Sequence, residues 1–164
     1  MRFSRVLRGF TTLAALAVAA GAAHAQQPGR EVAHATPVHV EVLIGYVSAQ
    51  PGTIDPAAAE LARMLGREFN LQTLRVLQLR QLSLALRQMG QVDLPTGHWV
   101  SVEPEEFTPR GLRMGVEVQG MLRTHVNVPS GNQVVIGAYS YEDGRLVVRL
   151  APTYEAPQSL PEGR

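Results

Sequence analysis

The chain contains no cysteine and no lysine, and only 5% of its residues are aromatic. The absence of cysteine excludes a disulfide-stabilised scaffold, a cysteine nucleophile and acylation at a lipobox cysteine. A chain without disulfides must be stabilised by its hydrophobic core. The basic residues are all arginine, which we attribute to genomic composition, and no segment carries a run of like charges. We therefore expect no nucleic acid partner.

The first 25 residues have the features of a secretory signal peptide. Arg2, Arg5 and Arg8 precede an apolar run that is too short to span a bilayer, and Ala23 and Ala25 supply small residues for cleavage. The segment has no Arg-Arg pair, which favours the general secretory (Sec) route. We predict cleavage after Ala25 and a periplasmic or secreted location in a bacterium.

The predicted mature chain has 139 residues, with 12 basic and 14 acidic side chains, so it is near neutral. This length suits one domain. No later apolar run approaches transmembrane length, so we expect no membrane span after cleavage. Composition predicts a flexible lead-in over residues 26–37, a single domain over residues 38–151 and a loose, proline-rich tail over residues 152–164.

The domain begins with a predicted central strand and a predicted helix. Residues 38–49 alternate with apolar side chains on one face and a partly apolar second face, as in a strand inside a sheet. Asp55 is a candidate N-cap before Pro56, and we expect a helix over residues 56–69 that stops at Asn70. The expected sheet-facing stripe of this helix consists of Ala57, Leu61, Met64, Leu65 and Phe69.

Residues 71–89 admit two interpretations. Their leucines could line a helix, and most residue types here favour one. Leucine also alternates at period two on either side of Arg80 and Gln81, where a bulge would fit. We predict strands, with Leu82, Leu84 and Leu86 pairing across a turn with Val92 and Leu94.

The remaining sequence predicts an antiparallel meander. Strand patterns cover residues 91–94, 98–104, 112–119, 122–128, 133–140 and 145–151, separated by short turn sequences. Apolar residues keep one parity in most of these strands, while the other parity, including Arg145 and Arg149, is expected to face water. The predicted fold class is α+β: a mainly antiparallel sheet with one helix packed on one face.

Catalytic and metal-binding patterns are missing from the sequence. There is no G-x-S-x-G nucleophile elbow, and no pair of histidines has the spacing of metal ligands. The acidic cluster Glu103, Glu105 and Glu106 lacks the pattern of a calcium loop, and no phosphate-binding glycine loop occurs. We expect no enzyme activity, no cofactor and no metal. The residues considered for these roles are Ser48, Ser83, Ser101, Ser130, Ser140, His34, His39, His98 and His125.

Residues 124–139, "THVNVPSGNQVVIGAY", resemble the last strand-turn-strand of the bacterial secretin domain, the outer-membrane ring of secretion and pilus systems. The matching features are the alternating strand, the Ser130-Gly131 turn and the second strand through Gly137, whereas Ala138 stands where the family has a second glycine. Residues 39–49 are similar to an early secretin strand. The mature chain is too short for a complete secretin, so the resemblance implies an exported domain that works beside an envelope machine.

Residues 125–139 are expected to form a hairpin, with Pro129 ending the first strand and either Gly131 or Asn132 taking a positive φ. We predict an exported, non-catalytic accessory or interaction protein of the cell envelope, whose partner is an envelope protein or a component of the secretion machinery. The alternative is a small-ligand binder, for a glycan or lipid, with a pocket between helix and sheet. Trp99, Tyr46, Tyr139, Tyr141 and Tyr154 could form a sugar platform, but packing is the expected use for most of them.

Overall fold

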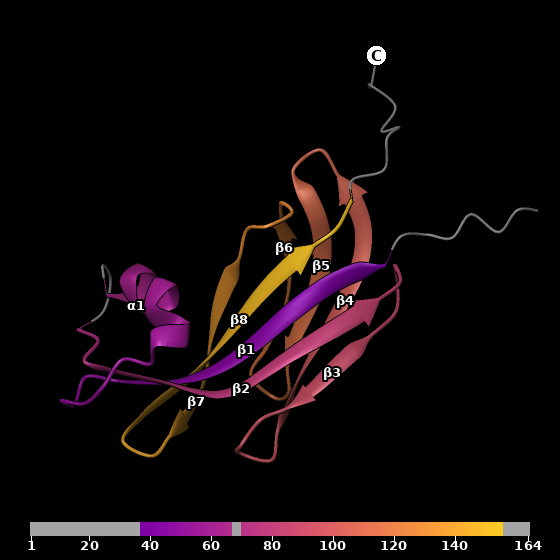
Figure 1. The fold of residues 1–164 in the computed structure, drawn as a ribbon. Helices are drawn as coiled ribbons and strands as arrows, with labels where there is room; N and C mark the ends of the chain where they lie inside the picture. Colours follow the sequence, from indigo (N-terminus) through magenta and orange to yellow (C-terminus); the bar gives the residue numbers. More distant parts are fainter. Residues whose placement is uncertain (1–36, 67–69, 156–164) are drawn as a thin grey trace, which may run out of the picture. The chain divides into compact units, whose positions relative to one another are not determined.

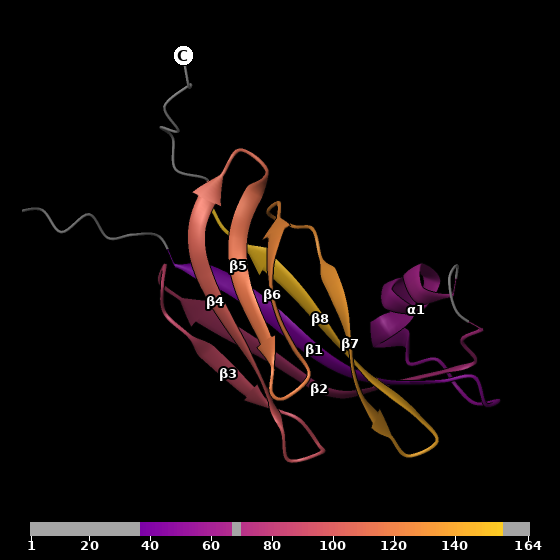
Figure 2. The ribbon, with the colours of Figure 1, turned by 180° about the vertical axis from the view of Figure 1, so that it is seen from behind.

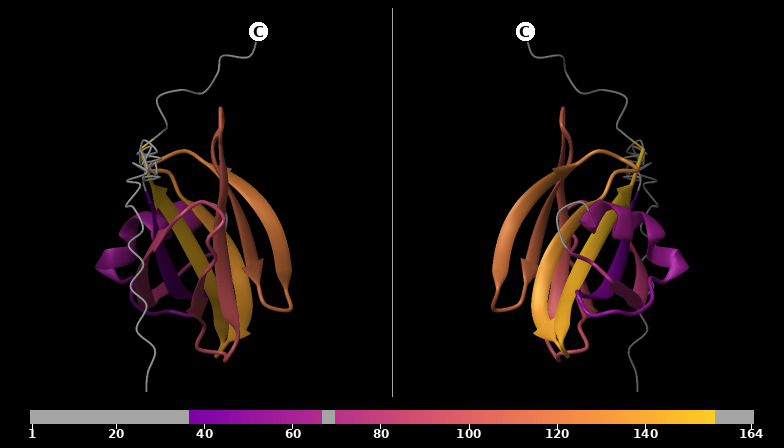
Figure 3. Two further views of the ribbon diagram at one scale, coloured as in Figure 1. Left: turned by 90° about the vertical axis from the view of Figure 1, so that its right-hand side faces the viewer. Right: turned by 90° about the vertical axis from the view of Figure 1, so that its left-hand side faces the viewer.

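The computed structural model describes residues 37–66 and 70–155, which belong to one compact unit of the chain. Within these residues, eight strands form two antiparallel four-stranded sheets, in the orders β2-β1-β8-β7 and β3-β4-β5-β6. We call them sheet A and sheet B. They lie face to face as two layers (Figures 1 and 2), and Figure 3 shows this arrangement edge-on. The predicted signal peptide, most of the lead-in and most of the tail lie outside the described residues.

Sheet A contains both ends of the folded chain. Strand β1 (Val38–Ser48) pairs with β2 (Thr73–Leu84) on one side and with β8 (Gly144–Thr153) on the other, and β7 (Val134–Tyr141) pairs with β8. The prediction that β1 is a central strand is confirmed. His39 pairs with Thr153, so the start of β1 and the end of β8 lie at the same end of the sheet.

Sheet B is a meander of the first four of the six strands predicted over residues 91–151, whereas the last two, β7 and β8, belong to sheet A. Sheet B runs through β3 (Gly90–Asp93), β4 (Trp99–Thr108), β5 (Gly111–Val118) and β6 (Leu122–Val128), each paired with the next. Strand β4 continues through Glu105 and Glu106, which the sequence pattern assigns to a loop. A register shift between Pro104 and Glu106 admits Glu105 as the extra residue of a bulge, so the strand can continue past the proline.

The main core lies between the two sheets. Every strand contributes alternate apolar side chains to this core, such as Val40 and Val42 in sheet A and Met114 and Val116 in sheet B. The predicted fold class is confirmed, since the described residues are mainly antiparallel strands with one short helix. The predicted layering is wrong: the apolar face of the meander packs against a second sheet rather than under the helix.

The helix packs on the outer face of sheet A. A 3-10 turn, η1 (Pro56–Ala58), leads into α1 (Ala59–Leu65), and Asp55 caps it by accepting a hydrogen bond from the Ala57 amide at 2.9 Å, as predicted. The buried residues are Ala58, Leu61 and Ala62, which pack on Leu43, Leu74 and Val147 in a second, smaller core. Figure 3 shows α1 on the side of β1 and β8 that faces away from β5 and β6.

Three details of the predicted helix are corrected. It ends at Leu65, with Gly66 as its C-cap, so Asn70 is not its stop. Ala57 is exposed and Met64 is 38% exposed, because only one side of so short a helix reaches the sheet. Phe69 lies outside the described residues.

Residues 71–89 contain one strand, β2 (Thr73–Leu84), and no helix, so the choice of strand over helix is confirmed. The bulge lies at Leu77 and not at Arg80 and Gln81. Ile44 of β1 pairs with Gln78 and the next residue, Gly45, pairs with Val76, so Leu77 has no partner on β1. The predicted pairing of Leu82, Leu84 and Leu86 across the turn is also wrong. Strands β2 and β3 belong to different sheets, so the segment between them is a crossover and not a hairpin turn.

The expected hairpin over residues 125–139 is wrong for the same reason. Strand β6 pairs with β5 and β7 pairs with β8, so residues 129–133 carry the chain from sheet B to sheet A. The turn itself forms as predicted: the Asn132 amide donates to the Pro129 carbonyl at 3.0 Å, and Gly131 has φ +78°. The same turn residues and the same strand alternation thus occur in a crossover between packed sheets, so these features do not distinguish it from a hairpin.

Strand β8 extends to Thr153, beyond the predicted domain boundary at Ala151. Proline is tolerated at position 152 because the pairing of β7 with β8 ends at Leu150, so Pro152 lies where one side of the strand is unpaired. Tyr154 then joins the two sheets. Its hydroxyl accepts from the Leu112 amide at 2.9 Å and donates to the Val128 carbonyl at 3.0 Å.

Gly131→Val is expected to lower the free energy of unfolding by about 1–2 kcal/mol, because a β-branched residue is strained at a positive φ. No atom lies within 4 Å of a Cβ built at this position, so the Cβ itself meets no neighbour and the expected loss comes from backbone strain. Thermal or urea unfolding measures it. Unchanged stability would show that the crossover turn does not require the left-handed conformation.

Candidate functional site

A groove of about 730 Å³ opens on the outer face of sheet A, between α1 and strands β8 and β7. Its apolar lining comes from the end of β1, the end of α1, the segment before β2 and the start of β7. Most of these side chains are aliphatic. The described lining residues are Val47, Ser48, Ala49, Met64, Leu65, Asn70, Leu71, Gln133, Val134, Val135, Gly137, Ser140, Gly144, Arg145 and Val147.

The groove is open because α1 covers only part of sheet A. Seven residues make the helix too short to cover β7, although Gln133 Nε2 approaches Glu60 Oε1 at 3.5 Å. Gly137 keeps the floor low: a Cβ built there would meet only the Cδ of Arg145, at 4.0 Å. A Cβ at position 137 therefore meets no close neighbour, and we expect a longer side chain there to extend into the groove.

Arg145 is the one charged side chain among the described lining residues. It lies on β8 opposite Val47 of β1 and Ser140 of β7. Its exposure agrees with the predicted water-facing parity. Arg149, on the same parity, differs from the prediction: its side chain is only 12% exposed and pairs with Glu41. Within the described part of the chain, the Arg149 Nε has no hydrogen-bond partner.

The turn between β7 and β8 closes one end of the groove's floor. Tyr46, a buried residue of β1, donates its hydroxyl hydrogen bond to the carboxylate of Asp143 in this turn. Arg75 covers the Tyr46 ring at 4.6 Å and pairs with Glu142 at 2.7 Å. The hydrogen bond to Asp143 raises the pKa of the Tyr46 phenol above its ordinary value of 10.0.

Tyr46→Phe is expected to lower the unfolding temperature at neutral pH, because Asp143 loses its donor. A tyrosine whose pKa is raised by folding contributes its stabilisation fully below pH 10.0, and this contribution is lost as the pH rises through the folded-state pKa. The difference between wild type and variant should therefore shrink above pH 10. A difference that stays constant into alkaline pH would contradict the assigned hydrogen bond.

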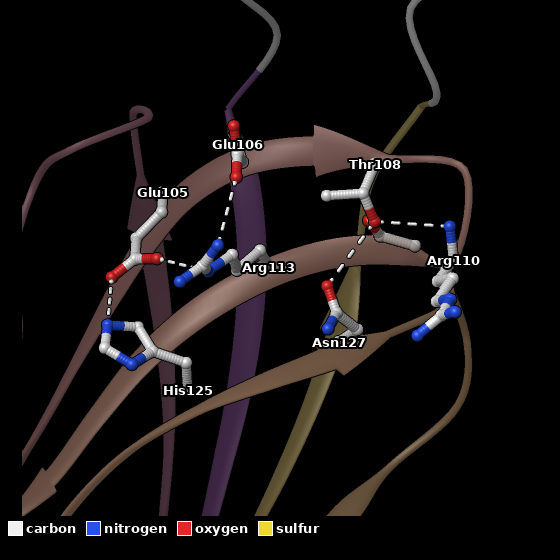
Figure 4. A network of polar contacts seen from close by, with 8 residues as sticks. Glu105, Glu106, Thr108, Arg110, Arg113, His125 and Asn127 are labelled. Atoms are coloured by element: carbon white, nitrogen blue, oxygen red, sulfur yellow. Dashed lines mark hydrogen bonds and ion pairs between the residues drawn. The ribbon is translucent and has the colours of Figure 1, made fainter.

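A polar network lies on the outer face of sheet B, away from the groove (Figure 4). The Glu105 carboxylate approaches Arg113 Nε at 3.1 Å and His125 Nε2 at 3.0 Å, and Gly115 leaves the space that it occupies. Arg113 and His125 are 44% and 51% exposed, so these polar contacts are surface interactions worth about 0–1 kcal/mol each. The network therefore stabilises the strand face weakly.

The structure does not assemble the residues considered for catalysis into one site. Ser48 and Ser140 line the groove, but none of its described lining residues is a histidine or an acid. His125 contacts Glu105 in the polar network of sheet B, and His98 stacks on Tyr139 with ring centres 4.1 Å apart. His39 lies near the start of β1, whereas the groove is lined by the end of that strand. His34 lies outside the described residues. Ser83, Ser101 and Ser130 lie on β2, on β4 and in the crossover turn, respectively.

The metal and aromatic candidates also stay apart. In residues 37–66 and 70–155, no group of three or more histidine or acidic side chains could hold a metal ion. Trp99 and the tyrosines do not line the groove. Tyr46 packs edge-on against Tyr141 and Tyr154 packs against Phe107, which are packing roles. The described helices include none that is both long and apolar enough for a membrane crossing.

The sequence indicates a pocket between helix and sheet only as an alternative, and it does not identify the residues that line the groove. Gly137 carried a signal, since a glycine inside a strand marks a bulge or an open approach to the backbone. Leu65 packs against the smaller core, as the predicted sheet-facing stripe requires, and also lines the groove, whereas Met64 of the same stripe lies beside the opening. Arg145 had no distinguishing signal.

Comparison with known proteins gives no relative. No protein-family model matches the chain, and no curated protein and no solved structure matches it.

Proposed function

We propose that this chain is an exported, non-catalytic protein of the bacterial cell envelope that works by binding, and that the groove beside α1 is its binding surface. The observation that carries the proposal is a concave, mainly aliphatic opening of about 730 Å³ on the outer face of sheet A. Sites for small ligands are concave, largely apolar and typically about 300–1,000 Å³ in volume. The groove has these properties, and its described lining has no acid or histidine for catalysis.

The geometry favours the small-ligand alternative, and within it a lipid-like ligand. A glycan would need aromatic platforms and many hydrogen-bonding groups, and the described lining contains neither tryptophan nor tyrosine. Aliphatic side chains such as Leu65, Leu71 and Val135 instead suit an acyl chain, whose burial is favourable without directional contacts.

A protein partner is the second candidate, and one observation favours it. Strand β7 is at an end of sheet A, and Val134, Val135, Gly137 and Ser140 of β7 line the groove. An extended peptide could add to this edge and place alternate side chains in the groove, as in recognition by strand addition. Such a partner would be an envelope protein or a component of the secretion machinery, as the secretin-like sequence of residues 124–139 implies.

Groove binding can be tested with the neutral apolar dye N-phenyl-1-naphthylamine, whose fluorescence rises in apolar surroundings. We expect the mature protein to enhance the fluorescence and Gly137→Leu to abolish the enhancement, because the leucine fills the floor. Asn127→Leu is the matched control, since it adds the same side chain to an exposed strand position of sheet B. Equal enhancement by all three proteins would refute groove binding.

The two candidate partners can be separated inside the periplasm. A photo-crosslinking amino acid at position 137 should give an adduct with the mass of a small molecule if the groove binds a lipid. A protein-sized adduct, absent when the crosslinker is at position 127, would instead favour the strand-addition mode.

A further inference from the structure

We propose that the groove selects a singly charged anionic amphiphile, a single-chain fatty-acid carboxylate, with Arg145 binding the carboxylate and the aliphatic lining holding the chain. This inference rests on the proposed function and adds the chemical class of the ligand. It depends on the electrostatic state of Arg145 and on the position of this residue beside the apolar floor.

Arg145 has no ion-pair partner among the residues that the structure describes. The two acids nearest to it in sequence contact other residues. Glu142 forms an ion pair with Arg75 at 2.7 Å, and the carboxylate of Asp143 accepts a hydrogen bond from the Tyr46 hydroxyl. On the same parity of β8, Arg149 is neutralised by Glu41. Arg149 and Arg145 therefore differ in having an acidic partner among the described residues. Arg145, which has none there, is the one that lines the groove.

The described lining also discriminates by charge. It contains one cationic side chain, several neutral polar groups such as Asn70, Gln133 and Ser48, and no acidic side chain. A guanidinium binds a carboxylate through two parallel, charge-assisted hydrogen bonds. Among these described residues, Arg145 is the one charge that a cationic head group would meet, and it repels that group. One positive charge is balanced by a carboxylate, whereas a phosphate monoester carries nearly two negative charges.

The apolar floor reaches the guanidinium stem. A Cβ built at Gly137 would lie 4.0 Å from the Cδ of Arg145, so the open space above Gly137 borders the arginine side chain. Val147 lies two residues after Arg145 on β8 and also lines the groove. A chain lying along Val135 and Val147 thus brings its head group to Arg145 without leaving the groove. The expected order of affinity is anionic above neutral above cationic amphiphile, for the same chain length.

Displacement of N-phenyl-1-naphthylamine from the mature protein tests this order with three probes of equal chain length: dodecanoate, dodecanol and dodecyltrimethylammonium, each below its micelle concentration. We expect dodecanoate to bind about tenfold more tightly than dodecanol, the effect of one charge-assisted contact. Arg145→Gln should remove this difference and leave dodecanol binding unchanged. Arg123→Gln, an exposed arginine of β6 paired with Glu117, is the matched control and should keep it.

Each other outcome has a definite meaning. Equal binding of dodecanoate and dodecanol that Gly137→Leu abolishes would overturn the charge selection and leave groove binding intact. A preference for dodecanoate that survives Arg145→Gln would also overturn the assignment. Failure of the dye and of every amphiphile to bind would refute the proposed function itself. Equal unfolding temperatures of the variants and the wild type verify that binding, and not folding, is compared.

Discussion

Gly111→Ala is expected to lower the free energy of unfolding by about 3 kcal/mol or more, since overpacking and backbone strain act together. Gly111 begins β5 with φ +114°, a conformation that essentially only glycine adopts. A Cβ there would lie 2.6 Å from the Pro129 nitrogen and 2.7 Å from the Val128 carbonyl oxygen. These are backbone atoms of the crossover from sheet B to sheet A, so they cannot move aside cheaply.

Gly97→Ala is the matched control for Gly111→Ala. Gly97 also has a positive φ, +81°, but no atom lies within 4 Å of its ideal Cβ. Its loss should therefore be about 1–2 kcal/mol from backbone strain alone. Urea unfolding of both variants measures the difference. Equal losses would mean that the close approach of β5 to the crossover is not present in solution.

Leu150→Ala should lower the free energy of unfolding by about 2–5 kcal/mol, the range for deleting a fully buried leucine side chain. Leu150 is 0% exposed and pairs with Val42 and Val134, and its side chain lies in the core between the two sheets. The loss combines the transfer of the missing methyl groups with the cavity that they leave.

Leu79→Ala tests the same substitution on the other face of sheet A. Leu79 lies on β2 and is 51% exposed, so its loss should stay within about 0.5 kcal/mol. Thermal unfolding of the pair measures how strongly the two faces differ. Comparable losses would contradict the assignment of the main core to the space between the sheets.

The strands were predictable because alternation is a local signal. The predicted strand over residues 122–128 coincides with β6, and the central position of β1 follows from its second apolar face, which packs under α1 through Leu43. The helix start was predictable as well, because the Asp55 side chain and Pro56 specify it chemically.

The division into two sheets was not predictable from the same signals. Alternation states which face of a strand is buried but not which surface covers it. The segments after Leu84 and after Val128 have ordinary turn residues, and such residues serve a hairpin or a crossover equally well. Only tertiary packing decides that β6 stays with β5 while β7 joins β8.

The groove was unpredictable for a related reason. Its described residues come from five separate stretches of the chain, and it exists because α1 ends at Leu65 before covering β7. The predicted helix to residue 69 would have placed Met64 over the sheet, together with Leu65, which does pack against the smaller core. The sequence did indicate a pocket between helix and sheet as one functional alternative, but Gly137 and Arg145 acquire their roles only from the register of β7 with β8.

The most direct test of the groove as the binding surface is an amide chemical-shift titration of the mature protein with N-phenyl-1-naphthylamine. We predict that shift changes cluster in three segments: residues 47–49, the end of α1 with Asn70 and Leu71, and the facing parts of β7 and β8. Changes confined to the outer face of sheet B, around Glu105 and His125, would contradict the assignment of the groove as the site.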